Sequence, residues 1–162
     1  KNLIIIGTIL LLIASLMYFY PQSNQMIKPT NFENVIITLK ENNISSRPVY
    51  KLTIYGNGTV IYEGKRFVNV TGIQTAEISQ DKIKELVDEF YKIDYFSLKK
   101  AIEKDEGFEC VIVTDLPTKI TSITINGRTK RVINYFGAPK ELDELEDKID
   151  EIVGSKKWVK GE

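Results

Sequence analysis

Apolar and polar residues alternate with a period of two from residue 35 onward, and this alternation constrains the fold more than any other feature. Glycine and asparagine interrupt the alternation at short intervals, which is typical of antiparallel strands joined by tight turns. In two places the apolar spacing changes to three and four residues, which indicates amphipathic helices. The sequence therefore predicts an α+β fold, with strands at 35–40, 49–55, 59–64, 72–78, 109–114, 119–125 and 128–134.

Both predicted helices carry start or stop signals. Ser79 is a good N-cap for the first helix, and Asp81 places a negative charge in its first turn. Pro139 suits the first position of the second helix, where a missing amide hydrogen costs nothing, and Gly154 ends that helix. The apolar stripes are Ile83, Leu86, Val87, Phe90 and Ile93 in the first helix and Leu142, Leu145, Ile149, Ile152 and Val153 in the second.

The two halves of this region follow a similar plan. Each half contains an Asn-Gly hairpin, at 52–59 and at 123–129, ahead of one amphipathic helix. We interpret the similarity as a weak internal duplication, in which each half is a hairpin or meander followed by a helix. The expected architecture is one continuous antiparallel sheet with both helices on the same face.

The glycine-flanked loop at 56–58 is predicted to be a hairpin turn and not a ligand site. A three-residue loop with Gly58 in a left-handed conformation places Lys51 opposite Glu63 and gathers the apolar residues of both strands on one face. A phosphate-binding loop leads into a helix N-terminus, whereas this loop leads into a strand.

The N-terminal run from Leu3 to Tyr20 contains no charged residue. As a helix it would be about 27 Å long, enough to cross a thin bilayer. Lys1 precedes the run, and an aromatic cluster at its far end precedes Pro21, as expected at a headgroup interface. We therefore predict a transmembrane anchor over residues 1–20, a tether over 21–34 and a single domain over 35–159 that lies outside the cytoplasm.

A cleaved signal peptide is the alternative interpretation, and it would make the domain a secreted protein. Residues 13–23 offer no small-x-small cleavage pattern, which favours the uncleaved anchor. Three Asn-x-Ser/Thr sequons fit an exported domain and make Asn43, Asn57 and Asn69 candidate glycosylation sites.

Composition removes several classes of function. The sequence contains no histidine, which is the commonest general base and zinc ligand. Cys110 is the only cysteine, so an internal disulfide is impossible, and its apolar surroundings predict an inert core thiol. The 22 Lys and Arg balance the 22 Asp and Glu, so no net charge attracts nucleic acid. We predict no cofactor, no metal and no nucleic-acid partner.

The leading hypothesis is a non-catalytic binding or protein-interaction module. The alternative is a hydrolase that uses carboxylates alone, with Asp115 and an acid of the 103–109 loop as the pair. Both features also fit a purely structural interpretation, as a turn and a solvated connector. The last helix has an acidic outer face, and we expect it to lie near Arg128, Lys130 and Arg131.

Several short motifs occur in a fixed order along the chain. They are Y-K-L-T-I-Y-G-N-G-T-V at 50–60, T-D-L-P-T at 114–118, the Asn-Gly hairpin at 126–127 and G-S-K-K-W at 154–158. Together they resemble an uncharacterised family of exported prokaryotic proteins that is classified only as a domain of unknown function. The resemblance covers about residues 35–159.

That family commonly carries a C-x-G-x-C-P segment before the first hairpin. In this chain Asn43 and Arg47 occupy the two cysteine positions, Ser45 replaces the glycine and Pro48 is retained. A disulfide, redox or metal role of the cysteine pair in relatives therefore cannot operate here, and the resemblance implies no activity.

Overall fold

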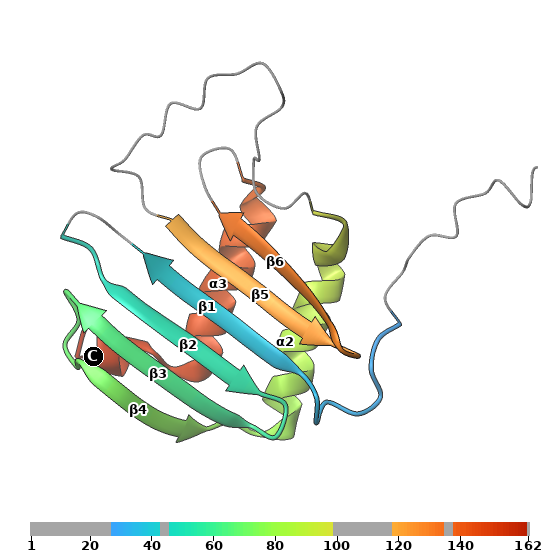
Figure 1. The fold of residues 1–162 in the computed structure, drawn as a ribbon, viewed down its shortest axis with the longest axis horizontal. Helices are drawn as coiled ribbons and strands as arrows, with labels where there is room; N and C mark the ends of the chain where they lie inside the picture. The colour runs from blue at the N-terminus through green and yellow to red at the C-terminus, as the bar shows by residue number, and fades with distance from the viewer. Residues whose placement is uncertain (1–26, 43–45, 99–117, 135–137, 162) are drawn as a thin grey trace, which may run out of the picture.

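The computed structural model describes residues 27–42, 46–98, 118–134 and 138–161, and its centre is a six-stranded antiparallel sheet (Figure 1). The strands lie in the order β4-β3-β2-β1-β5-β6. Their bounds are Ile36–Asn42 (β1), Val49–Tyr55 (β2), Thr59–Arg66 (β3), Gly72–Glu77 (β4), Thr118–Ile125 (β5) and Arg128–Asn134 (β6). The helices are α2 (Gln80–Lys92), α3 (Lys140–Val153) and the short α4 (Lys156–Val159), and η1 (Tyr95–Ser97) is a 3-10 turn.

Helices α2 and α3 lie on the same face of the sheet, behind the strands in Figure 1. Every second residue of the strands points into this interface, so that Ile37, Leu39 and Leu52 are fully buried against the helices. The predicted helix stripes supply the other side of the core, including Leu86 and Leu142. The α+β class and the placement of both helices on one face are confirmed.

Strands β1 to β4 form a meander, and the predicted β2–β3 hairpin is confirmed in its loop and its register. Lys51 lies opposite Glu63, and their side chains form an ion pair with an Nζ to Oε1 distance of 3.0 Å. Gly58 has a φ of 95°, which is the left-handed conformation that the three-residue loop requires. The loop at 56–58 is therefore a hairpin turn.

The second half of the chain resembles the first only in part. Strands β5 and β6 are joined by a two-residue turn in which Asn126 and Gly127 both have positive φ. Strand β5 has β1 on one side and β6 on the other, so both of its edges are occupied. The predicted strand at 109–114 lies outside the described residues. The two halves share the order of a hairpin followed by a helix.

The predicted helix ends are found within one residue. The Ser79 side chain accepts a hydrogen bond from the backbone amide of Lys82 at the start of α2. Pro139 is the N-cap of α3, not its first helical residue, and the helix begins at Lys140. Gly154 ends α3 with a φ of 67°.

The predicted membrane anchor at 1–20 and the first part of the predicted tether lie outside the described residues. Within the described part of the chain, no helix combines the length and the apolar character that crossing a bilayer requires. The later part of the predicted tether, residues 27–34, lies against the domain. Phe32 packs against the core, and the carbonyl of Ile27 accepts a hydrogen bond from the Tyr91 hydroxyl at 3.1 Å.

Gly56 of the β2–β3 loop lies in close contact with that N-terminal segment at Phe32, and its substitution should destabilise the whole fold. A Cβ atom at this position would lie 1.5 Å from the carbonyl oxygen of Phe32, which is backbone and cannot turn away. We expect Gly56→Ala to lower the free energy of unfolding by about 3 kcal/mol or more in urea denaturation, because the segment must move away from the sheet.

Gly127→Ala is the matched control for this substitution. Gly127 has a φ of 74° but open space around the Cβ position, so we expect only the conformational cost of about 1 kcal/mol. Equal effects of the two substitutions would contradict a steric role for Gly56.

Candidate functional site

The face of the sheet opposite α2 and α3 carries no helix among the described residues, and we call it the open face (Figure 1). The strand register aligns its side chains in three rows that cross all six strands. The rows are Glu77, Thr59, Tyr55, Ile36, Thr124 and Thr129; Thr75, Ile61, Thr53, Thr38, Ser122 and Arg131; and Ile73, Glu63, Lys51, Lys40, Ile120 and Ile133.

Hydroxyl groups dominate the middle of the open face. Thr38 and Ser122 share a hydrogen bond of 2.6 Å between their side-chain oxygens, across the β1–β5 pair. Thr53 is 7% exposed although it lies on this face, and its hydroxyl has no hydrogen-bond partner in the described part of the chain. At the margins Ile36 and Ile73 are exposed, Ile73 to 69%. The open face is thus polar in the centre, with apolar side chains toward the edges.

The neutral total charge of the chain hides a strong separation of charge between the two layers. The strands carry eight cations and three acids, whereas α2 and α3 carry five cations and eleven acids. The strand residues are Lys40, Lys51, Lys65, Arg66, Lys119, Arg128, Lys130 and Arg131, against Glu41, Glu63 and Glu77. The helix acids are Asp81, Glu85, Asp88, Glu89, Glu141, Asp143, Glu144, Glu146, Asp147, Asp150 and Glu151. The sheet layer is basic and the helix layer is acidic.

The ion pairs leave the cations of the open face partly uncompensated. The acids of α3 pair with Lys119, Lys140 and Lys148. Of the predicted cations of β6, Arg131 points to the open face, away from the helices, and Lys130 donates a hydrogen bond to the Leu98 carbonyl. Within the described ranges, neither Lys40 nor Arg131 takes part in an ion pair.

A second polar cluster lies buried between α3 and the sheet. Glu146 of α3 is fully buried, and one of its carboxyl oxygens accepts a 2.5 Å hydrogen bond from the Thr121 hydroxyl. The other oxygen accepts a 2.7 Å hydrogen bond from the side-chain amide of Asn134. Burial raises the pKa of the Glu146 carboxyl to about 7, although these two hydrogen bonds and Lys119 act in the opposite direction.

One turn further along α3, Asp150 is held in the same interface. The Tyr50 hydroxyl donates to one carboxyl oxygen at 2.7 Å, and the Ser155 hydroxyl donates to the other at 2.6 Å. Burial raises the pKa of Asp150, and burial together with Asp150 raises the pKa of the Tyr50 hydroxyl. Both carboxyl groups therefore have protein partners on each oxygen, and they fasten α3 to the sheet.

Sequence reasoning missed this buried cluster, although the sequence contains a signal for it. Glu146 lies four residues after Leu142 and three before Ile149, so it falls within the apolar stripe of the helix. An acid in that position points into the core and needs hydrogen-bond donors there. Thr121 and Asn134, which supply them, come from two different strands.

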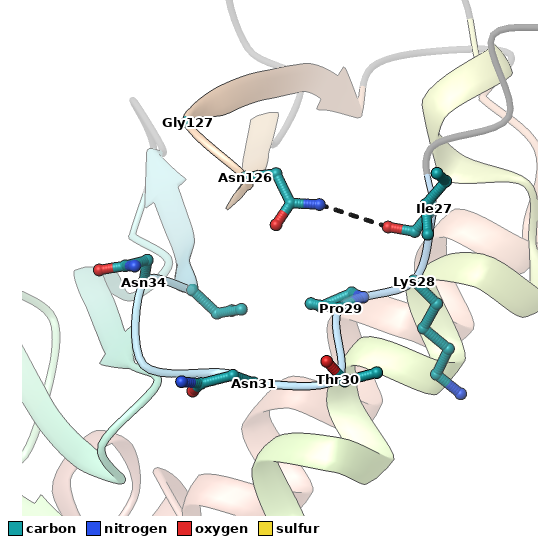
Figure 2. Close-up of a pocket in the computed structure, with 9 residues that line it drawn as sticks. Ile27, Lys28, Pro29, Thr30, Asn31, Asn34, Asn126 and Gly127 are labelled. Carbon is teal, nitrogen blue, oxygen red and sulfur yellow. Dashed lines mark hydrogen bonds between the residues drawn. The ribbon is translucent and has the colours of Figure 1, made fainter.

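A cleft of about 650 Å³ lies between the N-terminal segment and the β5–β6 turn (Figure 2). Asn126 points across it, and its side-chain amide donates to the Ile27 carbonyl at 3.4 Å. Lys28, the one ionisable residue in the lining, forms an ion pair with Asp88 of α2. The cleft offers amide, hydroxyl and backbone hydrogen bonds, and its one ionisable side chain is held in an ion pair.

The residues singled out from the sequence are dispersed. Asn57 is exposed in the β2–β3 loop, where its side-chain oxygen accepts a hydrogen bond from the Thr59 amide at 3.0 Å, and Asn69 is exposed beside Gly161. Asn43, Cys110, Asp115 and the 103–109 loop lie outside the described residues. No group of three or more Asp, Glu or Cys residues suited to a metal ion occurs in the described part of the chain.

Comparison with known proteins identifies the domain but no activity. Residues 35–153 match the family model described as Domain of unknown function (DUF6438). This match confirms the resemblance to an uncharacterised family. None of the curated proteins compared with the chain matches it.

The buried carboxyl of Glu146 should make the domain less stable as the pH rises from about 4.5 to neutrality. Between the ordinary glutamate pKa of 4.5 and the folded value of about 7, the folded protein retains a proton that the unfolded chain has lost. The free energy of unfolding should therefore fall by up to about 3 kcal/mol across this window, and the raised pKa of Asp150 acts in the same direction.

Urea denaturation of the protein and of Glu146→Gln between about pH 5 and pH 8 tests this expectation. The glutamine oxygen can accept from the Asn134 amide while its NH2 group donates to the Thr121 hydroxyl, and the side chain does not titrate, so most of the pH dependence should disappear. The exposed Glu144→Gln serves as the control and should retain it. An unchanged slope in Glu146→Gln would assign the dependence to other groups.

Proposed function

The chain belongs to the DUF6438 family, and we propose that its domain is a membrane-anchored, extracytoplasmic binding module without catalytic activity. In this proposal an acidic protein surface is the partner, and it contacts the open face of the sheet. One observation carries the proposal. The cations are concentrated in the sheet, one face of which has no helix among the described residues, and the acids are concentrated in helices α2 and α3.

Charge complementarity supports an acidic partner. On the open face Lys51 is paired with Glu63, so the described rows leave two cations, Lys40 and Arg131, against one acid, Glu77. The acids of α2 and α3 lie behind the sheet. Complementary charge accelerates encounter and disfavours partners of the wrong sign. A protein with a basic surface would meet repulsion at this face.

The size and chemistry of the open face also suit a protein partner. Three rows across six strands cover roughly 29 by 20 Å, on the order of 600 Å², which approaches the area that one partner contributes to a standard interface. The hydroxyl groups of Thr38, Thr53 and Ser122 offer hydrogen bonds in the centre. Exposed Ile73 adds apolar contact at the edge.

The buried carboxyl groups support a non-catalytic role. An active-site acid or base needs access to a substrate, whereas both oxygens of Glu146 and of Asp150 are engaged by protein donors. These groups explain the attachment of α3 to the sheet without requiring a reaction.

Membrane attachment in this proposal rests on the uncharged run from Leu3 to Tyr20. Residues 27 and 28 lie against the domain. The Ile27 carbonyl accepts hydrogen bonds from the side chains of Tyr91 and Asn126, and Lys28 forms an ion pair with Asp88. The anchor would thus enter the domain at the end of the sheet where the β5–β6 turn lies.

Charge reversal on the open face tests the binding surface. We expect the full chain in detergent to bind poly-L-glutamate, with an affinity that falls as sodium chloride is added. Lys40→Glu combined with Arg131→Glu should weaken this binding about tenfold or more, because both changes place acids against the polymer.

Lys92→Glu combined with Lys140→Glu is the matched control for that experiment. It makes the same change in net charge on the helix layer and removes only exposed ion pairs. Binding that is absent, or that both double variants weaken equally, would reject the open face as the site.

The topology is tested separately on cells. If the run from Leu3 to Tyr20 is an uncleaved anchor, carbonate should leave the protein in the membrane, and external protease should remove the domain from spheroplasts. Leu11→Arg with Leu12→Arg should abolish insertion, because each arginine costs about 2.5 to 3.5 kcal/mol near the bilayer centre. A mature protein that starts between residues 15 and 26 would instead indicate a cleaved signal.

A further inference from the structure

Phe67 is an exposed aromatic residue in an unfavourable backbone conformation. It follows the end of β3, has a φ of 55° and is 55% exposed. Bulky residues rarely adopt positive φ, and a residue held in this way suggests a functional constraint. The guanidinium carbon of Arg66 lies 6.0 Å from the centre of the Phe67 ring. The chain thus projects an aromatic ring and a cation together.

Helix α4 is hydrogen-bonded to the segment that follows Phe67. The amides of Val70 and Asn69 donate to the carbonyls of Trp158 and Val159 at 2.8 and 3.1 Å. The Trp158 ring stacks on Tyr62 of β3 with 4.9 Å between the ring centres. These contacts make α4 and the segment that follows β3 parts of one corner of the domain.

The corner is rich in lysine. Lys156, Lys157 and Lys160 belong to or follow α4, and Lys65 precedes Arg66. All four lysines are exposed, and in the described part of the chain none of them forms an ion pair. We call the set of Lys65, Arg66, Phe67, Lys156, Lys157 and Lys160 the basic corner.

We propose that the basic corner binds the anionic headgroups of a phospholipid membrane. Lysine and arginine side chains pair with lipid phosphates, and an exposed phenylalanine inserts its ring into the apolar layer directly behind them. An acidic protein surface would satisfy the cations, but only a bilayer interface supplies anions and an apolar layer at these adjacent depths. This inference extends the proposed membrane anchoring, which would keep the corner close to lipid at high effective concentration.

The position of the corner adds a geometric consequence. The chain end marked C lies beside the end of β3, whereas the N-terminal segment approaches the opposite end of the sheet (Figure 1). An anchor at one end and a lipid contact at the other would lay the domain along the membrane. The domain would then have a fixed orientation relative to the bilayer instead of swinging on its tether.

Trp158 provides a probe beside the basic corner, because it is next to Lys157 and is the only tryptophan of the chain. The full chain is reconstituted in phosphatidylcholine vesicles containing bromine-labelled lipid, with or without phosphatidylglycerol as about a third of the lipid. We expect bromine to quench Trp158 fluorescence more strongly when phosphatidylglycerol is present. Added salt should reverse the difference, because it screens the lysines from the headgroups.

Two variants test the residues of the corner. Each cation near an anionic surface strengthens binding about fivefold, so reversing Lys156, Lys157 and Lys160 to glutamate should lower the equilibrium constant for contact of the corner with lipid more than about hundredfold and remove the quenching that phosphatidylglycerol adds. Phe67→Asn removes the ring but suits a positive φ, so it should reduce quenching while the domain stays folded. Lys84→Glu with Lys92→Glu and Lys140→Glu reverses three exposed charges on the helix layer, away from the corner, and should leave quenching unchanged.

The outcomes separate this inference from the membrane anchor. If the chain floats with both kinds of vesicle but phosphatidylglycerol does not change the quenching of Trp158, the basic corner is rejected and the anchor stands. If the chain floats only with vesicles that contain phosphatidylglycerol, and the corner variants abolish this, the anchor is rejected and the corner stands. Absence of flotation with both vesicles rejects both.

Discussion

The pairing of β1 with β5 is the interaction on which the rest of the structure depends. β1 has neighbours on both edges, β2 from the same half of the chain and β5 from the other half. Its inward residues Ile37 and Leu39 are fully buried, each worth about 1.5 to 3 kcal/mol of apolar burial. Without this pair, the two units that each consist of a hairpin and a helix would be separate. The continuous six-stranded sheet that α2 and α3 cover would then not exist.

One-sided packing follows from that sheet and determines the distribution of charge. Because both helices use the same face, their acids gather on one side of the molecule while the strand cations form the other layer. A chain of zero net charge is thereby divided into two layers of opposite sign. The buried hydrogen bonds of Glu146 and Asp150 connect these layers, so two of the acidic residues of α3 also fasten the helix to the sheet.

The local features of the fold and its arrangement in two layers could be predicted from the sequence, whereas the order of the strands and the contacts between distant strands could not. The register of Lys51 with Glu63 follows from a three-residue turn and alternation, because these involve neighbours along the chain. The position of β5 beside β1 has no such local signal. The direction of Arg131 was therefore missed, and so were the donors Thr121 and Asn134 that meet Glu146 from separate strands.

The β1–β5 pair also has a kinetic consequence. Thr38 and Ser122, which are hydrogen-bonded across it, are separated by 84 residues of chain. At about 5 to 20 residues per second, a ribosome needs roughly 4 to 17 seconds to make that stretch. In the later part of this interval, once β4 has been made, the β1–β4 meander exists with one edge of β1 unpaired, so aggregation through that edge competes with closure of the sheet.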